Sequence, residues 1–201
     1  MEKLKMVFAS GNAGKIKEME YLANKYLNGS GFETELLGLK DIGLTDEIVE
    51  DGDTFEANAE IKARAAFDHS GMICFADDSG LCVDCLGGAP GIFSARYGGI
   101  QKLLDALKEV PDSQRTAHFY CAIYCILDKN TNFTVSGRCD GVIAREEIGS
   151  GGFGYDPVFY YPPAQKTFAQ LSPEEKNSVS HRAEAVGLFA KRIIKMLKES
   201  L

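Results

Sequence analysis

The sequence predicts an α/β fold built on a mixed β-sheet. Three features of the 201-residue chain lead to this expectation. Short apolar strands alternate with helices early in the chain, two long alternating segments follow in the middle, and an amphipathic helix ends it. Strand–helix alternation favours parallel strands and a long hairpin adds antiparallel ones, so we expect both kinds of pairing. No linker or low-complexity segment divides the chain, and residues 1–201 are expected to form one domain.

The first elements follow from apolar periodicity. The Ile16, Met19, Ala23 spacing indicates a helix after Asn12. In order, we expect a strand at 4–9, that helix, a strand at about 33–39, an alanine-rich helix at 54–68 and a strand at 72–76. Asp53 is expected to cap the 54–68 helix, with Glu56 three positions later.

The second half carries the hairpin and two further helix signals. After a helix at 100–109, the segments 115–127 and 132–145 alternate apolar and polar residues around a turn at Asp128–Thr131. Ser172, Pro173 and Glu175 predict a helix start, with an N-cap, an N1 proline and an N3 acid. An apolar stripe from Val186 to Leu197 predicts the last helix.

Composition excludes some classes of function. The chain has 22 basic and 29 acidic residues, a formal charge of −7, which argues against a general nucleic-acid binder. A small phosphorylated ligand is still compatible, because one local site can differ in charge from the whole. No apolar run reaches the roughly 20 residues that span a bilayer, and the N-terminus lacks a signal-peptide core. We therefore expect a cytoplasmic protein with no membrane partner.

Six cysteines raise the question of a metal or redox site. Cys82 and Cys85 form a C-x-x-C pair, but no second pair lies at zinc-site spacing. Cys121 and Cys125 lie in an apolar run, where cysteine behaves as a small hydrophobe. Structural thiols are favoured over metal or redox chemistry.

The first candidate site lies between the first strand and the first helix. Its sequence is Ser10-Gly11-Asn12-Ala13-Gly14-Lys15. Glycines let backbone N–H groups approach an anion, the helix dipole favours negative charge, and the lysine adds a cation. The spacing differs from that of a Walker A loop, and a plain turn with an Asn or Ser cap is an equal alternative.

Carboxylates form the second candidate. Residues 41–60 hold eight acids and no Lys or Arg. Most of these acids are expected on a solvated face, and Glu50 is the candidate Mg²⁺ ligand. Asp77 and Asp78 follow a buried strand, where ligands of open α/β sheets bind, and can hold a metal or serve as a base toward water. Asp-Asp-Ser-Gly is also favourable turn chemistry, so an Asx-turn is the alternative.

Two further segments fit a nucleotide. The run at 149–157 is rich in glycine and contains Phe153 and Tyr155, so a flat base could stack while backbone groups read its edge. Lys176, His181 and Arg182 form a cationic patch on an acidic protein, with donors suited to phosphate or a carbonyl oxygen. A flexible loop and ordinary surface charges are the alternatives. Together, the candidates are those expected of a site for a metal–nucleotide complex.

The motifs resemble those of the inosine/xanthosine triphosphate pyrophosphatases, over nearly the whole chain. The resemblance rests on the segments 10–15, 50–59, 76–81, 87–97 and 153–159, and on Glu175-Lys176-Asn177 with Ser180-His181-Arg182. Ser10, where many relatives carry Thr, keeps the hydroxyl, and Ala183 stands where Gly is common. The stretch 81–86 is unusually rich in cysteine for the family.

The resemblance implies an activity, a fold and a set of roles. The activity is Mg²⁺-dependent cleavage of a purine nucleoside triphosphate to the monophosphate and pyrophosphate, by a homodimer. The fold is an elongated mixed sheet with two lobes and a central active-site cleft. By motif, Ser10 to Lys15 hold the triphosphate, Glu50 and Asp78 hold the metal, and Asp78 activates water with Asp77 beside it. The residues implied to contact substrate are Ser79, Phe153, Gly154, Tyr155, Asp156, Lys176, His181 and Arg182.

Two other functions are compatible with the sequence. One is a different hydrolase, either a pyrophosphatase for modified pyrimidine nucleotides or a general phosphatase. The other is a nucleotide-sensing module without turnover, against which Asp77, Asp78 and Lys15 argue. For the favoured activity, Arg182 or His181 is the expected donor to the 6-oxo group of the purine, because adenine presents the reverse hydrogen-bonding pattern.

Overall fold

The computed structural model describes residues 2–27 and 32–199. The chain forms two compact units. The first comprises Met1–Asp78, Ala122–Gly137 and Ala183–Leu201, and the second Ser79–Cys121 and Arg138–Arg182. These units correspond to the two expected lobes, whereas the central cleft stays a prediction.

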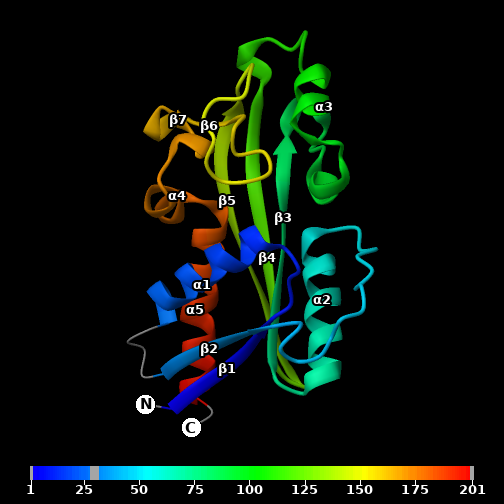
Figure 1. The fold of residues 1–201 in the computed structure, drawn as a ribbon, viewed down its shortest axis with the longest axis vertical. Helices are drawn as coiled ribbons and strands as arrows, with labels where there is room; N and C mark the ends of the chain where they lie inside the picture. Colours follow the sequence, from blue (N-terminus) through cyan, green and yellow to red (C-terminus); the bar gives the residue numbers. More distant parts are fainter. Residues whose placement is uncertain (1, 28–31, 200–201) are drawn as a thin grey trace. The chain divides into compact units, whose positions relative to one another are not determined.

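The strands of the described residues form one mixed sheet, which confirms the predicted α/β fold (Figure 1). The strand order is β2-β1-β3-β4-β5-β6-β7. β1 pairs in parallel with β2 and β3, and β6 pairs antiparallel with β5 and β7. The strands are β1 Glu2–Phe8, β2 Phe32–Gly38, β3 Ile73–Val83, β4 Thr116–Asp128, β5 Thr131–Ile143, β6 Phe159–Tyr161 and β7 Lys166–Thr167.

The helices also follow the prediction closely. They are α1 Ala13–Leu27, α2 Phe55–Ser70, α3 Gly99–Ala106, α4 Pro173–Val179 and α5 His181–Glu199. The predicted start of α4 is confirmed, because Ser172 Oγ accepts from the Glu175 N–H (3.1 Å) and the Glu175 carboxylate accepts from the Ser172 N–H (2.7 Å). No helix in the described part of the chain has the length and apolar character needed to cross a membrane.

Two predicted boundaries are wrong. β3 does not end before Asp77 but continues to Val83, because Leu81 and Val83 resume the buried apolar pattern and hold the backbone extended. The cap of α2 is Thr54 rather than Asp53. Thr54 has the extended backbone of an N-cap, and its side chain accepts from the N–H of Ala57 at 3.1 Å.

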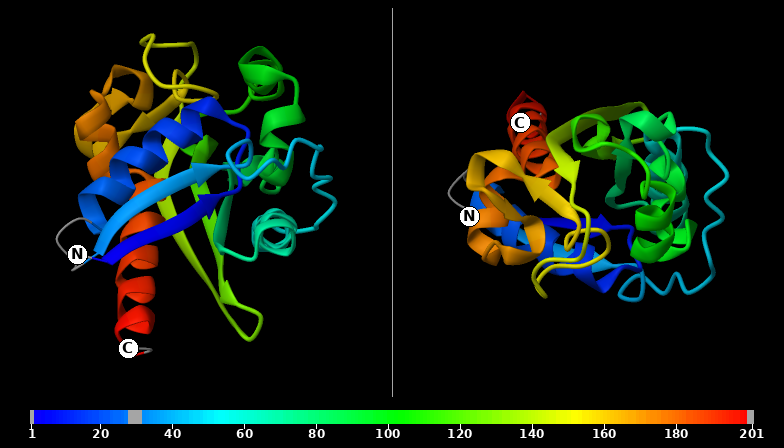
Figure 2. Two further views of the ribbon diagram at one scale, coloured as in Figure 1. Left: turned by 60° about the horizontal axis from the view of Figure 1, so that its bottom comes forward. Right: turned by 90° about the horizontal axis from the view of Figure 1, so that it is seen from above.

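Side chains of the central strands alternate between two helical layers in the first unit. On one face, Val7, Cys74 and Ala76 belong to a buried cluster that includes alanines of α2. On the other face, the rings of Phe8 and Phe75 stack, and Phe75 stacks on Phe189 of α5 with centroids 4.7 Å apart. Figure 2 shows α2 and α5 on opposite sides of these strands. Consecutive residues of β3 therefore face different helices.

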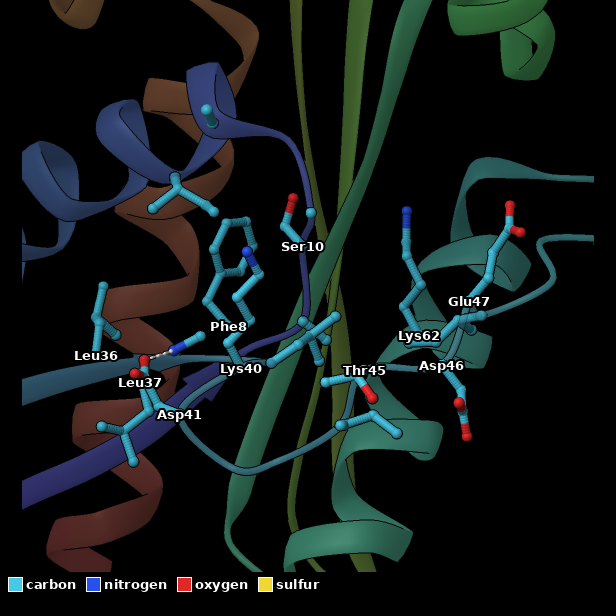
Figure 3. A pocket seen from close by; sticks show the side chains of 18 of the residues that line it. Phe8, Ser10, Leu36, Leu37, Lys40, Asp41, Thr45, Asp46, Glu47 and Lys62 are labelled. Carbon is cyan, nitrogen blue, oxygen red and sulfur yellow. Dashed lines mark hydrogen bonds between the residues drawn. The ribbon is translucent and has the colours of Figure 1, made fainter.

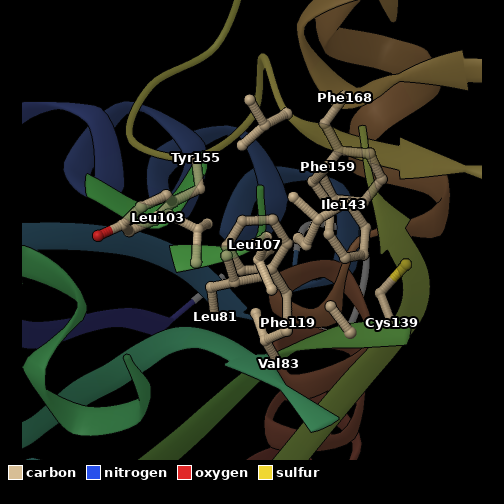
Figure 4. Close-up of a cluster of buried hydrophobic side chains, with 12 residues drawn as sticks. Leu81, Val83, Leu103, Leu107, Phe119, Cys139, Ile143, Tyr155, Phe159 and Phe168 are labelled. Atoms are coloured by element: carbon tan, nitrogen blue, oxygen red, sulfur yellow. The ribbon is translucent and has the colours of Figure 1, made fainter. Parts of the chain in front are cut away.

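The second unit has its own aromatic and aliphatic core (Figure 4). Leu81 and Val83 of β3 join Leu103 of α3 in this cluster. Phe119 of β4 packs against Phe159, with ring centroids 4.6 Å apart. This core contains residues from the end of β3 onward, which explains why β3 does not stop at its polar segment.

All six cysteines are free thiols. Five are buried, and Cys85 is exposed. Burial raises the pKa of the Cys74, Cys82 and Cys125 thiols, so the unreactive thiol form is favoured. The five buried thiols therefore fit the expected role as small apolar side chains.

A buried arginine joins three segments of the second unit. Arg115 is 2% exposed, and its guanidinium donates to the backbone carbonyls of Leu107 (2.6 Å), Ile143 (2.8 Å) and Ala144 (2.8 Å). Replacing Arg115 with alanine should lower the free energy of unfolding by about 2–4 kcal/mol, because three hydrogen bonds and a buried side chain are lost. Urea denaturation measures this effect.

Arg145 provides the matched control. It pairs with Asp112 at 2.8 Å, but both side chains are exposed. Arg145→Ala should change the free energy of unfolding by less than about 1 kcal/mol. Equal losses in the two variants would contradict the role assigned to Arg115.

Candidate active site

The connection between β1 and α1 is held by Asn12. Asn12 Oδ1 accepts hydrogen bonds from the N–H groups of Gly14 (2.9 Å) and Lys15 (3.1 Å), so this asparagine caps α1. The N–H groups of Gly11 and Ala13 have no hydrogen-bond partner within residues 2–27 and 32–199. They lie at the positive end of the helix dipole, so the cap and an anion site are compatible here.

Asp77 and Asp78 face opposite sides of β3. Because strand side chains alternate, Asp77 shares the side of Phe75 and Asp78 that of Cys74 and Ala76. Asp77 pairs with Lys15 of α1 at 3.2 Å, and Asp78 pairs with Lys62 of α2 at 3.6 Å. The two adjacent acids therefore have different partners.

The Lys15–Asp77 pair is buried. The Asp77 side chain is fully buried, and the Lys15 side chain is only 13% exposed. A buried charge is costly unless it is paired, and here the two opposite charges compensate each other. The pair fixes where the ammonium of Lys15 lies at the start of α1.

Lys62 brings together the two predicted metal ligands. Its ammonium lies 2.7 Å from Glu50 Oε2 and 3.6 Å from Asp78 Oδ1. Glu50 comes from the segment before α2, whereas Asp78 comes from β3. The carboxylates predicted as ligands from sequence thus converge on one cation.

Asn58 links the segment after Glu50 to Asp78. Its Oδ1 accepts from the N–H of Gly52 at 2.9 Å, and its Nδ2 donates to Asp78 Oδ2 at 3.2 Å. A Cβ on Gly52 would lie 2.8 Å from Asn58 Oδ1, so the backbone must approach as closely as only glycine permits. Asn58 is buried and ties the segment after Glu50 to the Asp78 carboxylate.

Electrostatics favour a charged lysine and a more basic carboxylate. Burial alone would lower the pKa of Lys62, but Asp78, Asp77 and Glu50 outweigh it and raise the pKa above its ordinary value. Burial raises the pKa of Asp78 above the usual aspartate range, although Lys62, Lys15 and Asn58 oppose the shift. A carboxylate of raised pKa is a better proton acceptor.

The donor set fits Mg²⁺ bound together with a phosphate ligand. No cluster of three or more His, Cys, Asp or Glu side chains suited to a metal occurs in the described part of the chain. Glu50 and Asp78 nevertheless share one cation, Lys62. Mg²⁺ commonly takes one or two carboxylates and completes its octahedral shell with water and substrate phosphates.

In the second unit, the glycine-rich segment wraps around a buried ion pair. Asp156 Oδ2 accepts from Lys176 Nζ at 2.6 Å and from the N–H of Phe153 at 2.8 Å. Gly152 has φ +70°, and a Cβ there would collide with the Asp156 carboxylate. The segment is therefore ordered around Asp156, in contrast to the alternative of a flexible loop.

The ring of Phe153 lies beside two cations. Lys176 Nζ is 4.7 Å from its centroid, and the Arg182 guanidinium carbon is 5.8 Å from it. Arg182 is 1% exposed and donates to Ser79 Oγ at 2.8 Å. Phe153 is half-buried, so a ring face near these donors is partly accessible.

Two predicted substrate contacts have other partners. Tyr155 belongs to the hydrophobic core, and its hydroxyl donates to the Ser94 carbonyl at 3.0 Å. The His181 ring stacks on Phe119, with centroids 4.7 Å apart and 13° between the planes. Phe153, rather than Tyr155, is the ring that is available for a base.

Asn58 and Lys62 were not predicted as site residues from the sequence. Both are buried polar residues of α2, four positions apart and hence on one helix face. The signal was present, because Lys62 follows a stretch of eight acids without a base and an asparagine precedes it by one turn. Only the fold shows that this face meets Asp78.

Comparisons with known proteins place the chain among close relatives. The Ham1 family model matches residues 6–192. A dITP/XTP pyrophosphatase of Shigella flexneri is 46% identical over 195 residues, which cover 92% of this chain and 95% of the relative. The solved HAM1 protein of Coxiella burnetii has a TM-score of 0.84 and 40% identity, covering 96% of this chain and 99% of that one. The Staphylococcus aureus Ham1 protein has a TM-score of 0.80 and 36% identity, with 94% and 97% coverage.

Proposed function

Because the chain belongs to the Ham1 family, we propose that it hydrolyses non-standard purine nucleoside triphosphates, such as ITP, dITP and XTP, to the monophosphate and pyrophosphate. The name of its relatives, dITP/XTP pyrophosphatase, supports the substrate class and the reaction. Within this chain, the strongest support is the convergence of Glu50 and Asp78 on Lys62. The removal of such nucleotides would cleanse the nucleotide pool.

The first unit carries the groups proposed to act on the triphosphate. Ser10, Gly11, Asn12, Ala13 and Gly14 would surround the phosphates, with Lys15 and Lys62 as cations. Glu50 and Asp78 would hold Mg²⁺, which supplies charge neutralisation of the phosphates and a more acidic water. Asp78 would accept the proton of the attacking water, and Asp77 would position Lys15.

The second unit carries the groups proposed to act on the base. Phe153 would stack on the purine, with Gly154 and Asp156 shaping the segment around it and Lys176 beside its ring. Arg182, oriented by Ser79, would donate to the 6-oxo oxygen, with His181 as the alternative donor. Adenine carries an amino group, a hydrogen-bond donor, in place of the 6-oxo oxygen. Two donors would then face each other and both would lack an acceptor, so the site should bind adenine poorly.

Loss of the Arg182 guanidinium should lower discrimination between bases. In Arg182→Met, the ratio of kcat/KM for ITP to that for ATP should fall at least about 10-fold, because a polar contact made by one base only is lost. Steady-state pyrophosphate release measures both constants. Arg138→Gln, which removes an exposed arginine of the same unit, should leave the ratio unchanged. An unchanged ratio in Arg182→Met would refute this assignment.

A substrate panel tests the function itself. With Mg²⁺ present, ITP, dITP and XTP should release pyrophosphate far faster than ATP, whose base lacks the 6-oxo oxygen. Release of orthophosphate would favour a phosphatase, preference for a modified pyrimidine would favour a different pyrophosphatase, and binding without turnover would favour a sensing module. The homodimer and the cytoplasmic location stay predictions, and sedimentation of the purified chain tests the first.

A further inference from the structure

A pocket of about 740 Å³ opens in the first unit beside the connection between β1 and α1 (Figure 3). Its walls come from Phe8 to Gly11, the first two turns of α1, the end of β2 with the segment after it, and Lys62 of α2. This volume lies within the range of pockets that bind small molecules. Part of the lining, Ser10, Gly11 and Ala13, belongs to the segment proposed to hold phosphate.

Two lysines extend into this pocket from opposite walls. Lys40 lies just after β2, and Lys62 lies on α2. Figure 3 shows the Lys40 side chain extending alongside Phe8 and the Lys62 side chain on the other side, with Ser10 between them. Two ammonium groups and a hydroxyl thus line the pocket, together with the carboxylates of Glu20, Asp41, Asp46, Glu47 and Glu50.

Lys40 differs from the other cations near the phosphate segment. Lys15 is paired with Asp77, and Lys62 is paired with Glu50 and Asp78. Lys40 has no ion pair or side-chain hydrogen bond within the described residues, and the neighbouring Asp41 carboxylate accepts from the N–H of Gly38 at 2.7 Å. Its ammonium is therefore available to an anion without breaking an existing pair.

We propose that Lys40 is a phosphate-binding residue, and that the part of the pocket beside Lys40 and Ser10 holds the terminal phosphates of the substrate and the pyrophosphate after cleavage. The inference rests on the proposed function for the identity of the anion. It also uses the N–H groups of Gly11 and Ala13, which line the pocket and have no partner among the described residues. A doubly charged terminal group would then meet an ammonium, a hydroxyl and backbone donors, which are the groups that favour a polyanion.

Binding of inorganic pyrophosphate tests this role without turnover. Calorimetric titration with pyrophosphate and Mg²⁺ should show roughly 5- to 20-fold weaker binding to Lys40→Gln, the size expected for one charge-assisted hydrogen bond from this exposed lysine. Lys40→Arg should retain most of the affinity. Lys17→Gln, which removes an exposed lysine of α1 outside the pocket, should bind pyrophosphate as the wild type does.

Inhibition by the nucleoside monophosphate IMP distinguishes a specific subsite for the terminal phosphates from a general effect of charge. Inhibition by IMP should be unchanged in Lys40→Gln, because IMP has no terminal phosphates, whereas inhibition by pyrophosphate should weaken and KM for ITP should rise with little change in kcat. Equal pyrophosphate binding by Lys40→Gln and Lys17→Gln would overturn the proposal, as would equal weakening of IMP and pyrophosphate. Failure of the wild type to hydrolyse ITP would instead overturn the proposed function, which the titration does not depend on.

Discussion

Replacing Asp78 with asparagine should lower kcat for ITP at least about 100-fold, the usual scale for loss of a positioned base. Asparagine keeps the shape of the side chain but cannot accept the proton of water. Its amide is also a poorer Mg²⁺ ligand than a carboxylate. Pyrophosphate release under saturating ITP and Mg²⁺ measures kcat. Asp68→Asn, which neutralises an exposed acid on α2, is the control and should keep normal turnover.

Stability separates this catalytic loss from misfolding. Burial raises the pKa of Asp78 in the folded state above its unfolded value. The contribution of this group to stability is therefore fully present below the unfolded pKa, and it is lost as pH rises through the folded pKa. At pH 7 the ionised carboxylate thus costs stability, and a neutral asparagine avoids that cost.

We therefore expect metal-free Asp78→Asn to resist urea at pH 7 at least as well as the wild type. The difference between the two proteins should shrink as the pH falls toward the unfolded pKa of aspartate. Near-normal turnover would refute the role of Asp78 as the base. A variant that is inactive but also much less stable would refute the electrostatic account of the site.

The order of elements was predictable because it depends on local patterns. The hairpin was found from the alternation on both sides of the turn at Asp128–Thr131, and the start of α4 from the sequence of Ser172, Pro173 and Glu175. The end of β3 was not predictable from the same rules. Asp77 to Gly80 has turn propensity, and only the packing of Leu81 and Val83 in a second core keeps it extended.

The residues of the candidate site were easier to predict from the sequence than the contacts between them. Glu50 and Asp78 are found as candidates from position and residue type, but their convergence on Lys62 depends on the register between α2 and β3. Tyr155 illustrates the opposite case. Its residue type suits stacking on a base, but the fold places it in the core, and no local pattern distinguishes it from Phe153.

The net charge of −7 was a poor guide to the site for a related reason. Most acids of residues 41–60 are exposed, as expected, but Glu50 is half-buried and pairs with the buried Lys62. The charge of a whole chain describes mainly its surface. The cations that would receive a polyanion are positioned one by one, by partners far away in the sequence.

Loss of Lys62 should also have a large effect on catalysis. In Lys62→Met, kcat/KM for ITP should fall roughly 100-fold, because removal of a single preorganised donor from a reacting centre has effects of this size. The loss should be smaller in Lys62→Arg, which keeps the charge. Initial rates of pyrophosphate release over a range of ITP concentrations measure kcat/KM.

Binding of Mg²⁺ alone should change in the opposite direction. In the free protein, the ammonium of Lys62 occupies the same two carboxylates that would hold the metal, at 2.7 Å from Glu50 and 3.6 Å from Asp78. Its removal leaves those carboxylates uncompensated, so metal-free Lys62→Met should be less stable than the wild type. Calorimetry should then show tighter Mg²⁺ binding, and Mg²⁺ should raise the melting temperature of the variant more than that of the wild type.

The opposite changes in Mg²⁺ affinity and in kcat/KM for ITP distinguish a lysine that shares the metal site from one that only supports the fold. If Lys62 only supported the fold, its loss would weaken metal and substrate together, since both need an intact site. If Glu50 and Asp78 do not share a metal, Mg²⁺ affinity would be unchanged by the loss of their common partner. Tighter binding of Mg²⁺ together with a lower kcat/KM for ITP is expected only if Lys62 has two roles. It would compete with the metal for the two carboxylates, and it would also attract the phosphates of the substrate.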